Sequence, residues 1–191
     1  MKKFFRWTLL VCCLIFLLLL LFSPYKQNDE VGYRCVASSI EINASTDEVF
    51  TYLGDSDNAR VWSIYVDHIT TLNADQVPDG KVGSVRRCFK QKDEKGIVWD
   101  EEVLLVEKNK RRRLSIFNSK KFPLITAGIR TEQIYEKINE NKTKLTFTMY
   151  VQEDKMGFFP YIKTKLSAYF VAYYFEKNIA NIKQDVENGK Q

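Results

Sequence analysis

The chain begins with an apolar run that constrains its location and fold more than any other feature. Residues 7–22 carry no charge, and Phe4 and Phe5 lengthen the run across Arg6, whose charged group can snorkel out of an apolar layer. About 20 apolar residues are enough to cross a bilayer as a helix. All 24 acidic residues lie after residue 28. The sequence therefore predicts a membrane segment followed by a separate polar domain.

The flanks of this run help to distinguish an anchor from a cleaved signal peptide, since length alone permits both. A cleavage site requires small residues one and three positions before the cut, but a cut after Ser23 has Leu21 at the third position and Pro24 directly after it. We therefore predict an uncleaved signal anchor over residues 1–22. Three basic residues precede the span and only Lys26 closely follows it. The positive-inside rule then predicts a single-pass protein of the cell membrane, with a cytoplasmic N-terminus and an extracytoplasmic domain.

Beyond the anchor the charges nearly balance. Three of the 29 Lys and Arg residues lie in the first six positions, which leaves 26 basic residues against 24 acidic ones. A nucleic-acid-binding domain would need a basic excess in its folded part, so we expect no nucleic acid partner. The total of 191 residues is enough for one folded domain. We place a polar linker at residues 23–32 and the domain at residues 33–191.

The first part of the domain predicts a strand followed by two short helices. Residues 33–43 alternate apolar and polar side chains, as a half-buried strand does. Ser45 and Glu48 have the spacing of a capping box, which predicts that a helix begins there. A second short helix is expected to end near residues 62–65.

The rest of the domain predicts further strands and one long helix. Turn residues divide residues 66–153 into about six strands. The basic run at residues 108–113 is expected to be a solvated hairpin turn, with attraction to anionic lipid headgroups as the alternative. Residues 158–187 lack Gly, and their single Pro, Pro160, suits the first turn of a helix, so the chain is expected to close with one long helix.

This order of elements resembles the helix-grip fold of the SRPBCC or START-like family, which includes Bet v 1-like, polyketide cyclase and lipid transport proteins. Three segments carry the resemblance: SSIEINASTDEVFTYLGDSDNARVWS, GKVGSVRRCF leading to GIVWDEEV, and the closing NIANIKQDVENG. The resemblance covers residues 36–187. It implies an α+β fold in which an antiparallel, curved sheet of about seven strands wraps around the C-terminal helix. It also implies a cavity between sheet and helix. None of the three segments is a catalytic signature.

Strand parity suggests which side chains would face that cavity. A three-residue turn at residues 93–95 would place Phe89 opposite Trp99 and Arg87 opposite Glu101. The charged pair could be an ion pair that only stabilises the structure. Alternatively, it could be a polar group that orients a ligand. The expected concave face supplies the candidate ligand-binding residues: Trp62, Arg87, Phe89, Trp99, Glu101, Phe147 and Met149.

Other reactive groups are sparse. Cys35 and Cys88 could form a disulfide in an oxidising compartment, or remain free as two isolated cysteines. His68 is the only histidine in the chain, and no Cys or His spacing matches a metal site. We expect no catalytic residue, no cofactor and no metal.

The function expected from these patterns is a noncatalytic module that binds or handles a hydrophobic small molecule or lipid at the membrane. The alternatives are a cyclase- or hydrolase-type enzyme using the same cavity, and an interaction domain whose cavity is filled by its own side chains. The C-terminal helix carries two apolar stripes. The second stripe, which includes Leu166 and Phe170, could contact lipid or form a homodimer, unless the helix kinks or the loop at residues 122–128 covers it.

Overall fold

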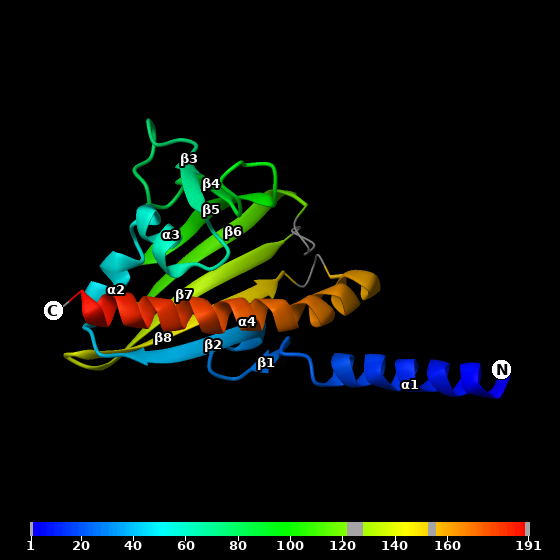
Figure 1. The fold of residues 1–191 in the computed structure, drawn as a ribbon. Coiled ribbons are helices and arrows are strands. Elements are labelled where there is room, and N and C mark those ends of the chain that lie inside the picture. The colour runs from blue at the N-terminus through cyan, green and yellow to red at the C-terminus, as the bar shows by residue number, and fades with distance from the viewer. Residues whose placement is uncertain (1, 122–127, 153–155, 190–191) are drawn as a thin grey trace.

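The computed structural model describes residues 2–121, 128–152 and 156–189. The elements follow in chain order as α1 (Lys2–Leu21), β1 (Lys26–Asn28), β2 (Tyr33–Ile42), α2 (Thr46–Tyr52), the 3-10 turn η1 (Ser56–Asn58), α3 (Ala59–Trp62), β3 (His68–Thr71), β4 (Val85–Phe89), β5 (Val98–Glu107), β6 (Arg111–Lys120), β7 (Ile129–Asn139), β8 (Lys142–Val151) and α4 (Phe158–Asn188). Figure 1 shows the sheet curving around α4, with α2 and α3 at one side. The predicted helix-grip fold is confirmed.

Within the described residues, the sheet has eight antiparallel strands in the order β1-β2-β8-β7-β6-β5-β4-β3. Seven of these strands were expected, and the additional one is β1. It lies within the segment assigned to a linker and pairs with β2, with Lys26 opposite Cys35. Its three residues are all polar, so the sequence shows no alternation of apolar and polar side chains. The strand forms because it pairs with β2. Tyr25, just before it, is buried in the core. The folded domain therefore begins almost directly after α1.

Local sequence explains where α2 begins. The Ser45 side chain accepts the Glu48 amide N–H at 3.3 Å, and the Glu48 carboxylate accepts the Ser45 amide N–H at 2.7 Å. This reciprocal pair satisfies two backbone donors that the first helical turn would otherwise leave open. The capping box predicted from the sequence is therefore formed.

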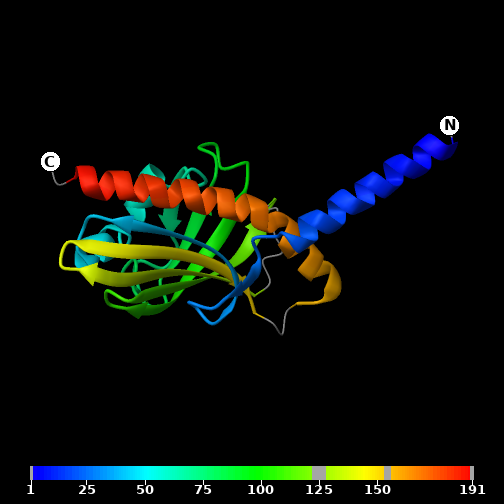
Figure 2. The same ribbon diagram turned by 90° about the horizontal axis from the view of Figure 1, so that it is seen from below.

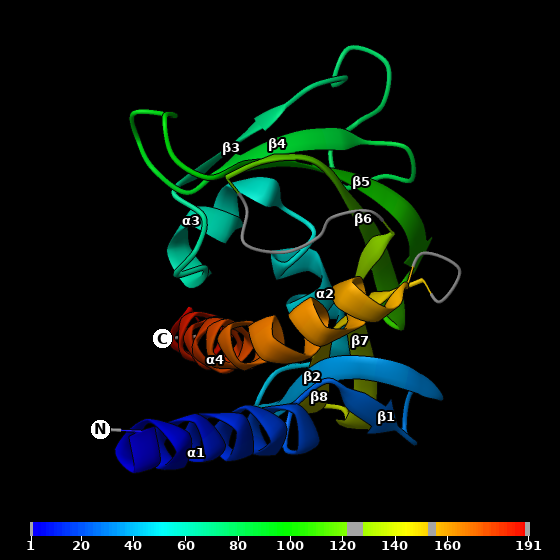
Figure 3. The same cartoon turned by 90° about the vertical axis from the view of Figure 1, so that its right-hand side faces the viewer.

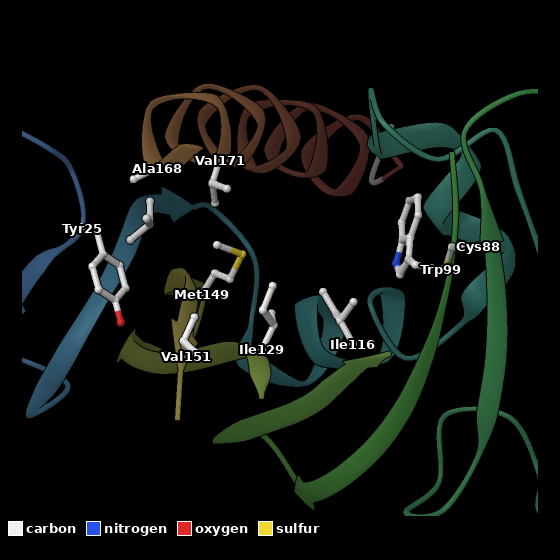
Figure 4. Close-up of a cluster of buried hydrophobic side chains, with 10 residues drawn as sticks. Tyr25, Cys88, Trp99, Ile116, Ile129, Met149, Val151, Ala168 and Val171 are labelled. Carbon is white, nitrogen blue, oxygen red and sulfur yellow. The ribbon is translucent and has the colours of Figure 1, made fainter. Parts of the chain in front are cut away.

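The core lies between the sheet and one face of α4. Leu145, Phe147, Met149 and Val151 alternate along β8 and are all buried, as the period-2 pattern predicts. Figure 4 shows Met149 and Val151 pointing toward α4, where Ala168 and Val171 meet them. Further along α4, a second buried cluster includes Ile179, Ile182 and Val186.

The second stripe of α4 lies mainly outside this core. Phe170 is 66% exposed and Tyr173 is 53% exposed. Tyr169 instead reaches α1, where its hydroxyl donates to the Leu19 carbonyl at 2.9 Å. The loop at residues 122–128 was one alternative that could cover this stripe. Residues 122–127 of that loop lie outside the described residues.

Helix α1 projects from the domain and is the one described helix that is long and apolar enough to cross a membrane, over Phe4–Leu21. None of that window is buried in the protein. Figure 2 shows α1 leaving the domain where it meets the first half of α4. An exposed apolar helix at the N-terminus is consistent with an anchor and with a signal sequence.

The basic run at residues 108–113 does not form a fully solvated turn. Only Asn109 and its neighbours make the turn, whereas Arg111, Arg112 and Arg113 enter β6. Arg111 and Arg113 lie on the convex face of the sheet, where both contact the buried Glu132 carboxylate. Arg112 points to the concave face and is buried.

Candidate functional site

A cavity of about 180 Å³ lies between α4 and the concave face of the sheet. In Figure 4, Trp99 and Cys88 lie on one side, Val171 and Met149 on the other, and Ile116 between them. Most of its lining is apolar or aromatic and comes from the α3 region, strands β4 to β8 and α4. The lining side chains used below are Trp62, Tyr65, Arg86, Cys88, Trp99, Glu101, Ile116, Gln133, Phe147, Met149, Ser167, Val171, Tyr174 and Asn178.

The pairing of β4 with β5 differs by one residue from the predicted register. Arg86 lies opposite Glu101, Arg87 opposite Asp100, and Cys88 opposite Trp99. The Lys90 amide donates to the Ile97 carbonyl at 3.0 Å, so residues 91–96 form the turn. The prediction assumed a turn with an odd number of residues. An even number shifts every pair by one residue. The residue that was expected opposite each position then points to the other face of the sheet.

The correct register places Arg86 and Glu101 together in the cavity wall. Arg86 Nε donates to Glu101 Oε2 at 2.9 Å, and Arg86 Nη2 lies 2.8 Å from the same oxygen. The remaining carboxylate oxygen, Oε1, accepts Trp99 Nε1 at 2.9 Å, and Arg86 Nη1 donates to Ser56 Oγ at 2.8 Å. Both charged side chains are largely buried, at 14% and 15% exposure. Burial opposes the charge on Arg86, but Glu101 together with Cys88 and Asp79 outweighs it, and the pKa of Arg86 is raised.

Arg87 and Phe89 do not line the cavity, contrary to the prediction. Arg87 forms two hydrogen bonds to Asp100 on the opposite face, at 2.7 and 3.0 Å. Burial would raise the pKa of Asp100, but the hydrogen bonds from Arg87 and Asn118 lower it. Phe89 stacks on His68, with ring centroids 4.6 Å apart. These residues stabilise the outer face of the sheet.

The other five predicted residues do line the cavity. Trp62 packs edge-on against Phe147, with ring centroids 5.9 Å apart, and Phe147 packs edge-on against Phe175 of α4. Met149 is buried beside them. Trp62 Nε1 is buried and has no hydrogen-bond partner among the described residues. Trp99 and Glu101 complete the five that line the cavity, and their role in ligand binding stays a prediction.

Several lining residues were not predicted from the sequence. An even-numbered turn would have identified Arg86 and Cys88 by parity. Asn178 carries no such signal: its side chain accepts the Ile64 amide at 2.9 Å, which ties the loop after α3 to α4. The rings of Tyr65 and Tyr174 lie 4.6 Å apart, joining this loop to α4 at the edge of the cavity.

A second buried arginine lies close to the cavity. Arg112 donates to Gln133 Oε1 at 3.0 Å and to the Tyr135 hydroxyl at 3.3 Å. Its guanidinium also lies 4.6 Å from the centre of the Phe50 ring. No carboxylate pairs with it among the described residues, and its Nε–H has no partner there. Burial lowers the pKa of Arg112.

The chemical groups at the cavity favour binding over nucleophilic attack. Cys88 is buried, and burial raises the pKa of its thiol well above the usual range, which disfavours the reactive thiolate. Cys35 and Cys88 are both free thiols, so the disulfide alternative is not formed in this structure. Within residues 2–121, 128–152 and 156–189, no three His, Cys, Asp or Glu side chains gather as a metal site.

Comparison with known proteins supports the fold. No family model and no curated protein matches the sequence. Among solved structures, the chain is similar to the Zhui aromatase/cyclase from Streptomyces sp. R1128, with a TM-score of 0.61, 14% identity, and coverage of 83% of this chain and 96% of that one. It is also similar to the protein XoxI from Bacillus cereus, with a TM-score of 0.59, 13% identity, and coverage of 82% and 98%.

A third neighbour has two domains. The di-domain ARO/CYC BexL from the BE-7585A biosynthetic pathway matches with a TM-score of 0.59 and 14% identity, over 81% of this chain and 47% of that one. The chain thus has the SRPBCC-like helix-grip fold shared by polyketide aromatase/cyclases and by structural-genomics proteins. At these identities the likeness concerns the fold, and the function has to be argued from the cavity.

Proposed function

We propose that this chain is a membrane-anchored binding module that holds a small hydrophobic molecule in the cavity under α4. One observation carries the proposal: among the described residues, the apolar and aromatic cavity has one fixed cationic group in its wall, the guanidinium of Arg86. Pockets of this kind commonly combine apolar walls with a few polar groups that set orientation.

The size of the cavity limits the ligand. About 180 Å³ is smaller than the ~300–1,000 Å³ of sites for drug-sized molecules. It is close to the engineered ~150 Å³ cavity that binds benzene. We therefore expect a ligand about as large as one aromatic ring or a short acyl chain, and a whole phospholipid would not fit.

Arg86 defines the polar end of the ligand. A guanidinium has five N–H donors, and the contacts with Glu101 and Ser56 use three of them. The two that remain can donate to a carbonyl, phenol or carboxylate oxygen. Because Glu101 fixes the guanidinium, the ligand does not bear the entropic cost of ordering this side chain.

The runner-up is an enzyme of cyclase or hydrolase type on the same cavity. The aromatase/cyclases among the similar structures favour it only through the shared fold. Glu101 is the acidic candidate, but both of its oxygens already accept hydrogen bonds from Arg86 and Trp99. A general base needs a free oxygen within reach of the proton that it removes, so this arrangement favours a fixed binding group.

Membrane anchoring by α1 places this cavity beside a source of apolar molecules. Helix α1 ends directly at the domain, because Ser23 donates to the Lys165 carbonyl of α4 at 2.6 Å. The charge bias of the flanks favours an extracytoplasmic domain. A homodimer through the exposed side of α4 remains the alternative role of that surface.

The test is to extract the full-length protein from membranes in a mild detergent and identify bound small molecules by mass spectrometry. Ser167→Leu narrows the cavity from α4, and Ala180→Leu adds the same side chain to the exposed face of that helix. We expect wild type and Ala180→Leu to retain one small apolar compound and Ser167→Leu to lose it. Indole, p-cresol and benzoate should raise the melting temperature of emptied protein. Empty wild type that ignores all three probes would contradict the proposal.

A further inference from the structure

A second hollow lies at the junction of α1 with the domain, separate from the cavity under α4. It has a volume of about 590 Å³, three times that of the cavity. Its walls are the end of α1, strands β1 and β2, and the first half of α4, which Figure 3 shows next to one another. We call it the juxtamembrane groove. The lining residues used here are Leu21, Phe22, Lys26, Arg34, Tyr161, Lys165 and Glu176.

The groove combines an apolar wall with a cationic one. Leu21 and Phe22 end the apolar run and are 72% and 70% exposed. Lys26, Arg34 and Lys165 bring three positive charges, against the one negative charge of Glu176. No carboxylate lies within ion-pair distance of these three cations in the part of the chain that the structure describes. Uncompensated cations beside apolar surface match a molecule that has both an anionic head and apolar chains.

Contacts within the groove hold the cations in place. Arg34 Nη1 donates to the Tyr161 hydroxyl at 3.0 Å. The Arg34 guanidinium and the Lys165 ammonium each lie 5.6 Å from the centre of the Tyr161 ring. Arg34 uses only one of its donors in the hydrogen bonds found, so most of the guanidinium remains available to a phosphate.

With α1 across the bilayer as proposed, the groove would lie at the depth of the phosphate groups. Lys165 Nζ donates to the Leu20 carbonyl at 2.7 Å, so this cation is level with the last turn of the apolar helix. Figure 1 shows α4 beginning on the side from which α1 projects. Phe158 and Phe159 are exposed there, seven and six residues before Lys165, which is about 10 Å along the helix. Exposed aromatic rings beyond the cations are typical of a membrane interface.

We propose that the juxtamembrane groove binds the headgroup of an anionic phospholipid, whose chains lie along Leu21 and Phe22. The proposal rests on the proposed anchoring of α1 in the membrane and is independent of the ligand of the cavity under α4. The cationic wall binds the phosphate, and the aromatic start of α4 enters the adjacent interface. The bound lipid would then fix the orientation of the domain on the bilayer.

The experiment uses the full-length protein in mixed micelles containing equal amounts of phosphatidylglycerol and phosphatidylcholine, with native mass spectrometry to count retained lipid. Lys26→Gln with Arg34→Gln removes two groove cations. Lys92→Gln with Lys110→Gln makes the same charge change at two exposed turns far along the chain. A cation near a charged leaflet changes affinity roughly fivefold. We expect wild type and the control pair to prefer phosphatidylglycerol, and the groove pair to lose about 25-fold of that preference.

Three results would overturn the proposal. Wild type could retain the two lipids equally, the two double variants could lose preference equally, or millimolar glycerol phosphate could displace the lipid, which would assign the groove to free phosphate. Melting temperatures verify that both variants fold. The intact mass separates this proposal from the anchoring: a chain that lacks residues 1–22 would overturn both, whereas a full-length chain without lipid preference would overturn the groove alone.

Discussion

The pair of Arg86 and Glu101 makes a prediction that tests both the register and the polarity of the cavity. Arg86→Met and Glu101→Leu each remove one charge and keep a side chain of comparable size. Each leaves its partner largely buried and unpaired, since the two side chains are only 14% and 15% exposed. Breaking a buried pair in this way costs about 3–5 kcal/mol. For a chain of this length, that corresponds to a fall in melting temperature of roughly 6–20 °C.

The double variant should be much less destabilised than either single variant. Replacing both partners by apolar residues removes the desolvation cost of both charges. Trp99 Nε1 loses its acceptor on Glu101, and Ser56 Oγ loses its donor on Arg86. An unsatisfied buried donor costs about 1–3 kcal/mol, so the double variant should lie in that range. The single-variant costs therefore add to about 6–10 kcal/mol, far above the cost of the double variant.

The assay is thermal unfolding of the full-length protein in detergent, followed by tryptophan fluorescence. Arg87→Met with Glu101→Leu is the matched control, because Arg87 pairs with Asp100 on the other face. Its two costs should add. Additive costs for Arg86 and Glu101, or coupling between Arg87 and Glu101, would refute the register and the argument built on it.

Three further predictions follow from the same structure. Burial raises the pKa of Cys35 to about 11 and that of Cys88 well above its usual value, so the thiolates form only at alkaline pH and maleimide at pH 7.5 should label these two thiols only after unfolding; labelling in the folded protein would show that the core is open. Ser45→Ala removes the capping box and should cost about 1 kcal/mol, or 2–4 °C, whereas Ser45→Asn should retain most of the stability. Alkaline phosphatase fused after Gln191 should be active in bacterial cells, and a fluorescent protein that folds only in the cytoplasm should stay dark; the reverse would place the domain inside the cell.

Periodicity predicted those parts of the fold in which one face is buried along a whole element. Strand β8 is the clearest case, since Leu145, Phe147 and Met149 occupy alternate positions and all face the core. The helix α4 was found for the same reason, with Ile179 and Ile182 on its buried side. Burial leaves a strong mark on the sequence because every second or third residue must be apolar.

The strand register and single side-chain contacts have weaker signals in the sequence. The partner of Glu101 depended on whether the turn after β4 holds an odd or an even number of residues, which composition does not determine. Strand β1 has three polar residues and exists because β2 offers an edge for pairing. The burial of Arg112 within a basic run was equally hidden, because a charge run ordinarily indicates solvent.

Arg112 bears directly on what the cavity can bind. Arg86 and Arg112 place two positive charges on the concave face, and Glu101 supplies one buried negative charge. Gln133 lines the cavity and uses its Oε1 to accept from Arg112 and from the Tyr135 hydroxyl, so that acceptor is already occupied. Trp62 Nε1 lines the same space without a partner among the described residues. Trp62 Nε1 and Arg112 Nε are therefore two buried donors at or near the cavity without an acceptor among the described residues, a local excess of donors. A ligand that brings an oxygen acceptor would correct this imbalance, whereas a pure hydrocarbon would leave it, so benzoate or p-cresol should bind more tightly than toluene of similar size.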